Sequence, residues 1–245
     1  MEYLFTAQQR SDLMLSVLPK PPRPALSVVG TERMFLVRRI YCIGRNYAAH
    51  AREMGHDPDR EPPFFFMKPA DALLPVPAGE TAELPYPPKT ASYHYEVEMV
   101  VALSGGGRDI PVEAALDQVY GYAVGLDMTR RDLQDEAKHL RRPWELGKAA
   151  DFSAPVGPLR PVTQVGHLAR GSISLSVDGI VKQSGDLADM IWSVAEQVSY
   201  LSSYFELHPG DLIFSGTPEG VGAVSCGQTM VAAIQSVGEI RLRVV

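Results

Sequence analysis

Hydrophobic and polar positions alternate along several short stretches of this chain, which is the pattern of strands with one buried face. The clearest case is residues 172–177, where Asp178-Gly179 follows and predicts a hairpin turn before residues 180–181. Further strands are predicted at residues 96–103, 122–126, 211–214 and 238–245, the first two as nearly continuous apolar runs.

Helical periodicity is confined to three stretches. Residues 46–54 form a short predicted helix, with Asn46 as the N-cap and Gly55 as the stop. A second helix is expected over residues 111–120. The third, residues 187–205, has the most complete apolar stripe and is predicted as one continuous helix.

Short strands, few helices and the 21 Gly and 20 Pro that separate them predict a β-rich α+β fold. A doubly wound sheet would need regular alternation of strands and helices, which this chain lacks. Prolines gather in residues 20–24 and 75–88, which we expect to be loops. We expect a short N-terminal region over residues 1–40 and a main domain over residues 41–245.

Composition excludes several classes of partner. The 245 residues include 23 Lys and Arg against 29 Asp and Glu, a net charge of −6, and no basic cluster exceeds Arg141-Arg142, so nucleic acid is not expected. No apolar stretch approaches the roughly 20 residues of a membrane span, and no secretory signal is visible. Two cysteines, Cys42 and Cys226, suit a reducing compartment. We therefore predict a cytoplasmic protein without a membrane partner.

Three carboxylates lie at the ends of the two most apolar predicted strands. Glu96 and Glu98 are two residues apart, so they share one face of their strand, and Asp127 follows the next apolar run. Like charges beside a core are costly unless a cation compensates them, and Mg2+ or Mn2+ prefers such oxygen ligands. For the Glu pair alone, a solvated strand face is the simpler interpretation. Together, the three carboxylates indicate a metal site.

His50 and Glu53 are three residues apart and would share one face of the first predicted helix. An imidazole held by a carboxylate can act as a base toward water near neutral pH. An incidental pair on a solvated helix is the alternative.

Arg131 and Gln134 lie in a dense polar segment after Asp127 and could hold a substrate carboxylate, although an exposed charged turn has the same pattern. Lys148 lies among apolar residues and is suited to stabilise a developing oxyanion, unless it reaches out to solvent. Residues 209–222 form a predicted strand that enters a Gly-rich turn, which would present amides and small hydroxyls to an anion.

The order of these motifs is more specific than any one of them. The chain contains, in series, Gly-Arg-Asn-Tyr-x-x-His-x-x-Glu, Phe-Met-Lys-Pro, Tyr-Glu-Val-Glu, Gly-x-Asp-x-x-x-Arg-Asp-x-Gln, Gly-Lys, Asp-Gly…Gln and Gly-Asp-Leu-Ile-x-x-Gly-Thr-Pro-x-Gly-Val-Gly. Over residues 38–245 this series resembles the fumarylacetoacetate hydrolase family. Within the family, the segments around Arg45 and Lys68 are most similar to the branch of the fumarylpyruvate hydrolases, and acylpyruvate hydrolases and oxaloacetate decarboxylases are similar at the same sites.

The resemblance implies a β-rich fold with a mixed sheet rolled into a barrel, a homodimer and one Mg2+ or Mn2+ ion. It places the metal ligands at Glu96, Glu98 and Asp127. It also implies catalytic roles for His50, Glu53 and Lys148, and substrate-binding roles for Arg131, Gln134 and Thr217.

The activity that the resemblance implies is hydrolysis of the C3–C4 bond of a 2,4-diketo acid, such as fumarylpyruvate in the gentisate pathway of aromatic degradation. The metal would chelate the carboxylate and 2-oxo group, and His50, oriented by Glu53, would activate the attacking water. Two alternatives remain open: decarboxylation of oxaloacetate at the same site, and metal-dependent binding of small oxo acids without catalysis.

Overall fold

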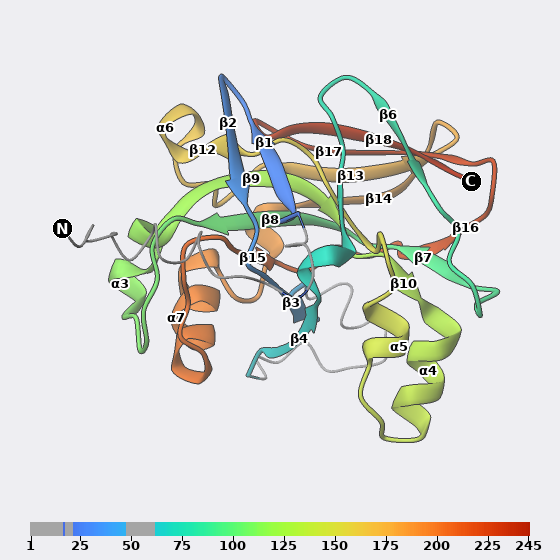
Figure 1. The fold of residues 1–245 in the computed structure, drawn as a ribbon, viewed down its shortest axis with the longest axis horizontal. Coiled ribbons are helices and arrows are strands. Elements are labelled where there is room, and N and C mark those ends of the chain that lie inside the picture. The colour runs from blue at the N-terminus through green and yellow to red at the C-terminus, as the bar shows by residue number, and fades with distance from the viewer. Residues whose placement is uncertain (1–16, 18–21, 48–61) are drawn as a thin grey trace.

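The computed structural model describes residue 17, residues 22–47 and residues 62–245. A large mixed sheet occupies the centre of the molecule (Figure 1). Its strands run in the order β4 (Phe64–Lys68), β3 (Arg39–Gly44), β15 (Asp211–Phe214), β8 (Val97–Leu103), β9 (Val119–Leu126), β11 (Ala154–Val156) and β5 (Leu73–Pro75), and β12 (Arg160–Pro161) also pairs with β9. The pairs β3–β15 and β5–β11 are parallel, and the other pairs of this sheet are antiparallel.

Three smaller sheets complete the β-structure of the described residues. A five-stranded sheet has the order β14 (Ile180–Asp186), β13 (Ser172–Val177), β17 (Thr229–Ile234), β18 (Gly238–Val244) and β6 (Thr81–Leu84). A three-stranded sheet consists of β10 (Thr129–Arg130), β7 (Tyr93–Tyr95) and β16 (Gly222–Val224). A hairpin of β1 (Ala25–Val28) and β2 (Thr31–Leu36) forms the last.

Strand β8 is buried on both faces, because the large sheet lies between two cores. Met99 and Val101 face the main core, which also contains Leu175 of the five-stranded sheet. Val100 and Ala102 face a second core, which also contains residues of β1, β3 and β15. Both faces of the central strands are therefore apolar, which explains the continuous apolar runs in the sequence.

Helices cover only part of the sheet. α7 (Val194–Tyr204) packs with α3 (Val112–Ala115) on one side of β3 and β4, and α4 (Arg131–His139) and α5 (Glu145–Lys148) form a pair on the other side (Figure 1). The remaining helices of the described residues are α6 (Val162–Val165) and three 3-10 turns, η1 (Ala70–Ala72), η2 (Leu116–Gln118) and η3 (Leu187–Asp189). No helix in the described ranges is long and apolar enough to span a membrane.

The predicted strands are confirmed, and so is the β-rich α+β class with a mixed sheet. The hairpin at Asp178-Gly179 joins β13 to β14, with Asp178 at φ 49° and Gly179 at φ 79°, as a tight turn requires. Strand β14 runs to Asp186, five residues beyond the predicted end, because β13 continues to pair with it.

The predicted helices are corrected in three ways. Residues 187–205 are not one helix. The 3-10 turn η3 ends at Asp189, and α7 begins at Val194, where the N-cap Ser193 forms a capping box with Glu196. Residues 111–120 are a four-residue helix followed by η2, and β9 already begins at Val119. Helix α4 was not predicted, because its first turn is dense in charge and the only residues buried in it are Arg131, Gln134 and Ala137. The predicted helix 46–54 lies mostly outside the described residues.

Candidate metal centre and active site

The three carboxylates converge on one face of the large sheet. Glu96 lies one residue before β8, Glu98 lies within it, and Asp127 lies one residue after β9. Glu98 pairs with Gly125 in the β8–β9 ladder, and Asp127 N donates a 2.9 Å hydrogen bond to Glu96 O, so the ladder brings the three together. One oxygen from each carboxylate lies within 4.8 Å of the others, and all three residues are buried.

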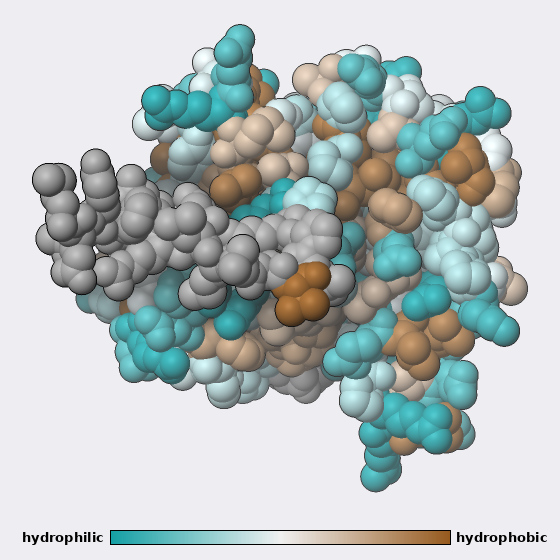
Figure 2. Space-filling view, in the orientation of Figure 1, coloured by the Kyte–Doolittle hydropathy of each residue, from teal (hydrophilic) through white to brown (hydrophobic). Residues whose placement is uncertain are grey.

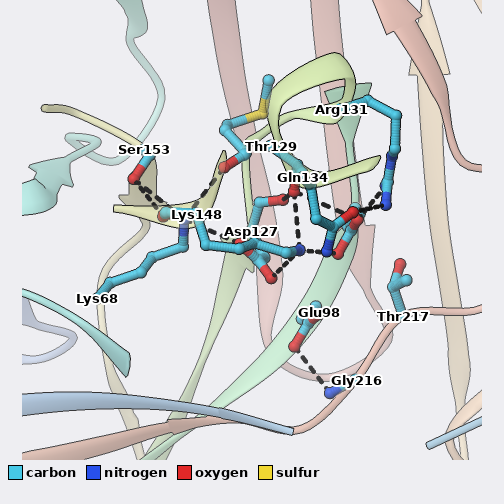
Figure 3. A network of polar contacts seen from close by, with 12 residues as sticks. Lys68, Glu98, Asp127, Thr129, Arg131, Gln134, Lys148, Ser153, Gly216 and Thr217 are labelled. Carbon is cyan, nitrogen blue, oxygen red and sulfur yellow. Dashed lines mark hydrogen bonds and ion pairs between the residues drawn. The ribbon is translucent and has the colours of Figure 1, made fainter. Parts of the chain in front are cut away.

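Three buried cations surround two of these carboxylates (Figure 3). Lys148 Nζ lies 2.8 Å from Glu96 Oε2 and 2.7 Å from Asp127 Oδ2, and it also donates to Thr129 Oγ1 at 2.8 Å. Lys68 Nζ lies 2.9 Å from Asp127 Oδ1, and Arg131 pairs with Glu96 Oε1. Burying these charges is tolerable only because each has an opposite charge in contact.

Lys148 remains a cation despite its burial. Burial alone would lower the pKa of its ammonium, but the negative charges of Asp127 and Glu96 outweigh this effect and raise the pKa above its ordinary value. The ammonium also lies 4.9 Å from the centre of the Phe66 ring. Lys148 is thus neither a surface lysine nor a candidate for a neutral base, but a fixed positive charge beside the carboxylates.

Glu98 is the carboxylate that lacks compensation. It accepts a 2.7 Å hydrogen bond from Gly216 N, and no Lys or Arg in the described part of the chain forms an ion pair with it. Burial raises its pKa well above the ordinary value, and the negative charges of Asp127 and Glu96 raise it further. Asp127 Oδ1 forms an ion pair with Lys68 but accepts no hydrogen bond, so this oxygen keeps lone pairs for another ligand. A hard divalent cation would satisfy both groups, and the all-oxygen donor set fits Mg2+ or Mn2+.

A pocket opens above the carboxylates. Its floor is the three acidic groups and Lys148, and its lining on the α4 side is Arg131, Gln134 and Lys138. Phe64, Phe66 and Trp144 form an aromatic wall, in which the rings of Phe64 and Trp144 meet edge to face at 5.3 Å. Ile43, Gly44, Arg45 and Thr217 are the other described residues that line it. The pocket therefore combines a charged floor with a flat apolar side.

The Gly-rich turn after β15 supplies the fourth side. Gly216 has φ 99°, a conformation that favours glycine, and its amide points at Glu98. Thr217 Oγ1 accepts a 2.8 Å hydrogen bond from Gln183 Nε2, and Gln183 Oε1 accepts one from Val97 N. The turn is thereby tied to the start of β8, which holds Thr217 at the pocket.

Two of the predicted catalytic residues, His50 and Glu53, lie outside the described residues. The preceding Asn46 is buried, and its side chain bridges two other segments. Asn46 Nδ2 donates to Trp192 O at 2.9 Å and to Ser215 O at 2.8 Å, and Asn46 Oδ1 accepts from Trp192 N at 2.7 Å. Asn46, near the end of the described range 22–47, is therefore anchored to the turn that carries Gly216 and Thr217.

Comparison with known proteins identifies the family. Residues 39–245 match the family described as "Fumarylacetoacetate (FAA) hydrolase C-terminal". The crystal structure of fumarylpyruvate hydrolase from Pseudomonas aeruginosa, in complex with Mn2+ and pyruvate, is 59% identical, with a TM-score of 0.93 over 94% of this chain and 99% of that one.

This chain belongs to the fumarylacetoacetate hydrolase family.

Curated relatives within the family carry different activities. The fumarylpyruvate hydrolase of a Ralstonia species is 42% identical over 78% of this chain and 98% of its own length. The mitochondrial oxaloacetate tautomerase FAHD1 of Arabidopsis thaliana is 41% identical over 87% of this chain and 94% of its own. Membership of the family therefore establishes the fold and the kind of site. It does not establish the substrate, because relatives of similar identity have different activities.

Sequence reasoning missed two residues of the site. Lys68 donates 3.0 Å hydrogen bonds to Met128 O and Ser153 Oγ, besides its ion pair with Asp127. The available signal was a single lysine at the end of the aromatic strand Phe64–Lys68, where a cation needs a buried partner. Lys138 was missed because α4 was not predicted, so its position on the same helical face as Arg131 and Gln134 was not apparent.

Proposed function

We propose that this protein is a metal-dependent hydrolase that cleaves the C3–C4 bond of a 2,4-diketo acid, with fumarylpyruvate as its substrate. The observation that carries this proposal is the 59% identity over 94% of the chain to a fumarylpyruvate hydrolase whose crystal structure contains Mn2+ and pyruvate. The buried cluster of Glu96, Glu98 and Asp127 supports it independently, because it offers three oxygen ligands to one cation.

The residues of the site have separate tasks in this proposal. Glu96, Glu98 and Asp127 hold one Mg2+ or Mn2+ ion, which supplies Lewis-acid polarisation of the 2-oxo acid. Lys148 stays protonated beside the floor and stabilises negative charge that develops on the substrate oxygen. Arg131, Gln134 and Thr217 bind and orient the substrate from α4 and the Gly-rich turn, and the aromatic wall excludes water from its apolar part.

Hydrolysis also needs a base that takes a proton from water. We assign this task to His50, held in orientation by Glu53, on the basis of the family motif that carries both residues. Replacement His50→Ala is expected to abolish turnover and leave Mn2+ binding intact, as measured by calorimetric titration. Full activity in this variant would contradict the assignment.

The alternative function uses the same cation and a different reaction. The oxaloacetate tautomerase of Arabidopsis thaliana and the oxaloacetate decarboxylase of Dictyostelium discoideum are 41% and 40% identical, so oxaloacetate is the competing substrate. Assays with purified protein and Mn2+ should compare fumarylpyruvate and oxaloacetate side by side, with chelator as the blank. A kcat/KM that is higher for oxaloacetate would overturn the proposal.

We further propose that the protein works as a homodimer in the cytoplasm, in the degradation of aromatic compounds through gentisate. The family resemblance of the sequence supports this setting, and so does the similarity to bacterial fumarylpyruvate hydrolases. Light scattering on the purified protein should give the mass of two chains, and a monomer would contradict the dimer.

A further inference from the structure

One face of α4 carries every basic or amide group that this helix contributes to the pocket. Arg131, Gln134 and Lys138 have positions i, i+3 and i+7, so they form a stripe along one side of a helix. All three line the pocket. The stripe therefore runs from the carboxylate floor, where Arg131 contacts Glu96, outward along the pocket.

The two charged residues at the ends of this stripe differ in their burial and in their ion-pair partners. Arg131 is buried and engaged with Glu96 and Gln134. Lys138 is partly exposed, with 28% of its side-chain surface accessible, and its described ion pair is a 3.2 Å contact with Asp135. Asp135 is itself 58% exposed, so this pair lies at the surface and contributes little to stability. A substrate anion can therefore approach Lys138 at a small cost.

The aromatic wall directs a ligand toward Lys138. Its ammonium lies 5.6 Å from the centre of the Trp144 ring, and Trp144 packs against both Phe64 and Phe66. Burial lowers the pKa of Lys138, which means that its ammonium is partly stripped of water at this position. A flat, unsaturated chain lying on these rings would end at this cation.

The distance between the two ends of the stripe favours long dicarboxylic acids over short ones. Seven residues of α-helix separate the Cα atoms of Arg131 and Lys138 by about 10 Å along the axis. An extended seven-carbon diketo diacid spans about 7–8 Å between its terminal carbons, at about 1.25 Å per bond, and its carboxylate oxygens add to this reach. Oxaloacetate spans only about half that length, so it cannot contact the floor and Lys138 together. Acetylpyruvate lacks the second carboxylate altogether.

We propose that Lys138 binds the distal carboxylate of the substrate and makes the enzyme selective for long dicarboxylic 2,4-diketo acids. This inference rests on the proposed hydrolase function and adds the residue that recognises the far end of the substrate. The free end of the α4–α5 pair projects from the body of the molecule, and its surface is mostly hydrophilic (Figure 2).

The test compares two substrates that differ at the distal end. Wild type, Lys138→Ala, Lys138→Gln and Lys138→Arg are assayed with Mn2+ on fumarylpyruvate and on acetylpyruvate. For fumarylpyruvate, loss of a charge-assisted hydrogen bond should lower kcat/KM about 10- to 100-fold in the Ala and Gln variants, mainly through KM. Lys138→Arg should retain most of the activity. For acetylpyruvate, all variants should match wild type.

A matched control is Lys182→Ala, which removes an exposed lysine from β14, in the five-stranded sheet, and should change neither activity. Equal effects of the Lys138 variants on both substrates, or no effect on fumarylpyruvate, would overturn the role of Lys138. Failure of wild type to cleave either substrate would instead overturn the proposed hydrolase function, so the two failures are distinguishable.

Discussion

At the scale of single residues, the site is a set of buried charges that depend on one another. Lys148 contacts Glu96 and Asp127 at once, and only 3% of its side-chain surface is exposed. Removal of one member of a buried ion pair leaves the partner charge without compensation. The same carboxylates can be compensated by a bound divalent cation, so Lys148 and the cation both neutralise the negative charge of Glu96 and Asp127.

Replacement Lys148→Met should therefore destabilise the metal-free protein strongly, by about 3–5 kcal/mol. With saturating Mn2+ the loss should be smaller, because the cation compensates the buried carboxylate charge that the substitution leaves without a partner. Urea denaturation with chelator and with Mn2+ measures both values. Lys182→Met, at an exposed lysine, should change neither, and an equal loss in both conditions would contradict the shared role.

Glu98 should make the stability of the metal-free protein depend on pH. Its pKa in the folded chain is raised above the ordinary value of 4.5, so between these two values the folded state binds more protons than the unfolded state. The contribution of Glu98 to stability is therefore full below 4.5 and is lost as the pH rises through the folded pKa. Denaturation across this range should show the decline in wild type and a smaller one in Glu98→Gln.

Glu98→Gln should also weaken the binding of the metal. Loss of one carboxylate ligand should weaken Mn2+ binding about 100-fold, as judged from the strength of charged ligand contacts. An unchanged affinity in calorimetric titration would remove Glu98 from the ligand set.

The sequence indicated the carboxylates because two of them lie two residues apart in an apolar strand and the third follows the neighbouring run. It did not indicate Lys68, since its partner Asp127 is 59 residues away and only the β-sheet brings them together. Residues 48–61 include His50 and Glu53, so their dyad stays a prediction from motif spacing.

At the scale of elements, the placement of α4 against α5 positions the side chains that α4 contributes to the pocket. Gly147 of α5 packs on Gln134 of α4 so closely that an added Cβ would lie 2.8 Å from Gln134 Cβ and 3.0 Å from its backbone. No rotamer change relieves a contact with backbone, so a larger residue must push the two helices apart.

Replacement Gly147→Ala should accordingly cost about 1–3 kcal/mol of stability. It should also lower kcat/KM about 10- to 100-fold, because displacement of α4 misplaces Arg131 and Gln134. Steady-state kinetics together with urea denaturation measure both effects. The control is Leu146→Ala, at a residue of the same helix that is 70% exposed, and a Gly147→Ala enzyme with wild-type kinetics would contradict the positioning role of this contact.

Elements were predictable where their apolar residues form a clear pattern. Strand β13 alternates between apolar and polar residues, so its limits were found, and β15 was found from its continuous apolar run. Helix α4 was not found, because most of its residues are charged and its buried face consists largely of the polar site residues themselves. The break between η3 and α7 was also hidden, since the apolar spacing continues across it.

At the scale of the whole molecule, the fold keeps the site at a junction of sheets. The central strands β8 and β15 of the large sheet are buried on both faces, and the carboxylates lie where β8 and β9 meet the three-stranded sheet and α4. Because most residues of β8 pack on two cores, the metal ligands stand on a rigid support. The class of fold followed from strand patterns, but the pairing of distant strands such as β3 with β15 did not, because each short strand has several compatible partners.

If this site hydrolyses a carbon–carbon bond of fumarylpyruvate, oxygen from water must enter one of the products. Purified protein with Mn2+ is given fumarylpyruvate in water enriched in oxygen-18, and the products are analysed by mass spectrometry. We expect equal amounts of fumarate and pyruvate, with one oxygen-18 atom in the newly formed carboxylate of fumarate. Absence of fumarate, or fumarate whose carboxylates carry no label, would contradict the proposed hydrolysis.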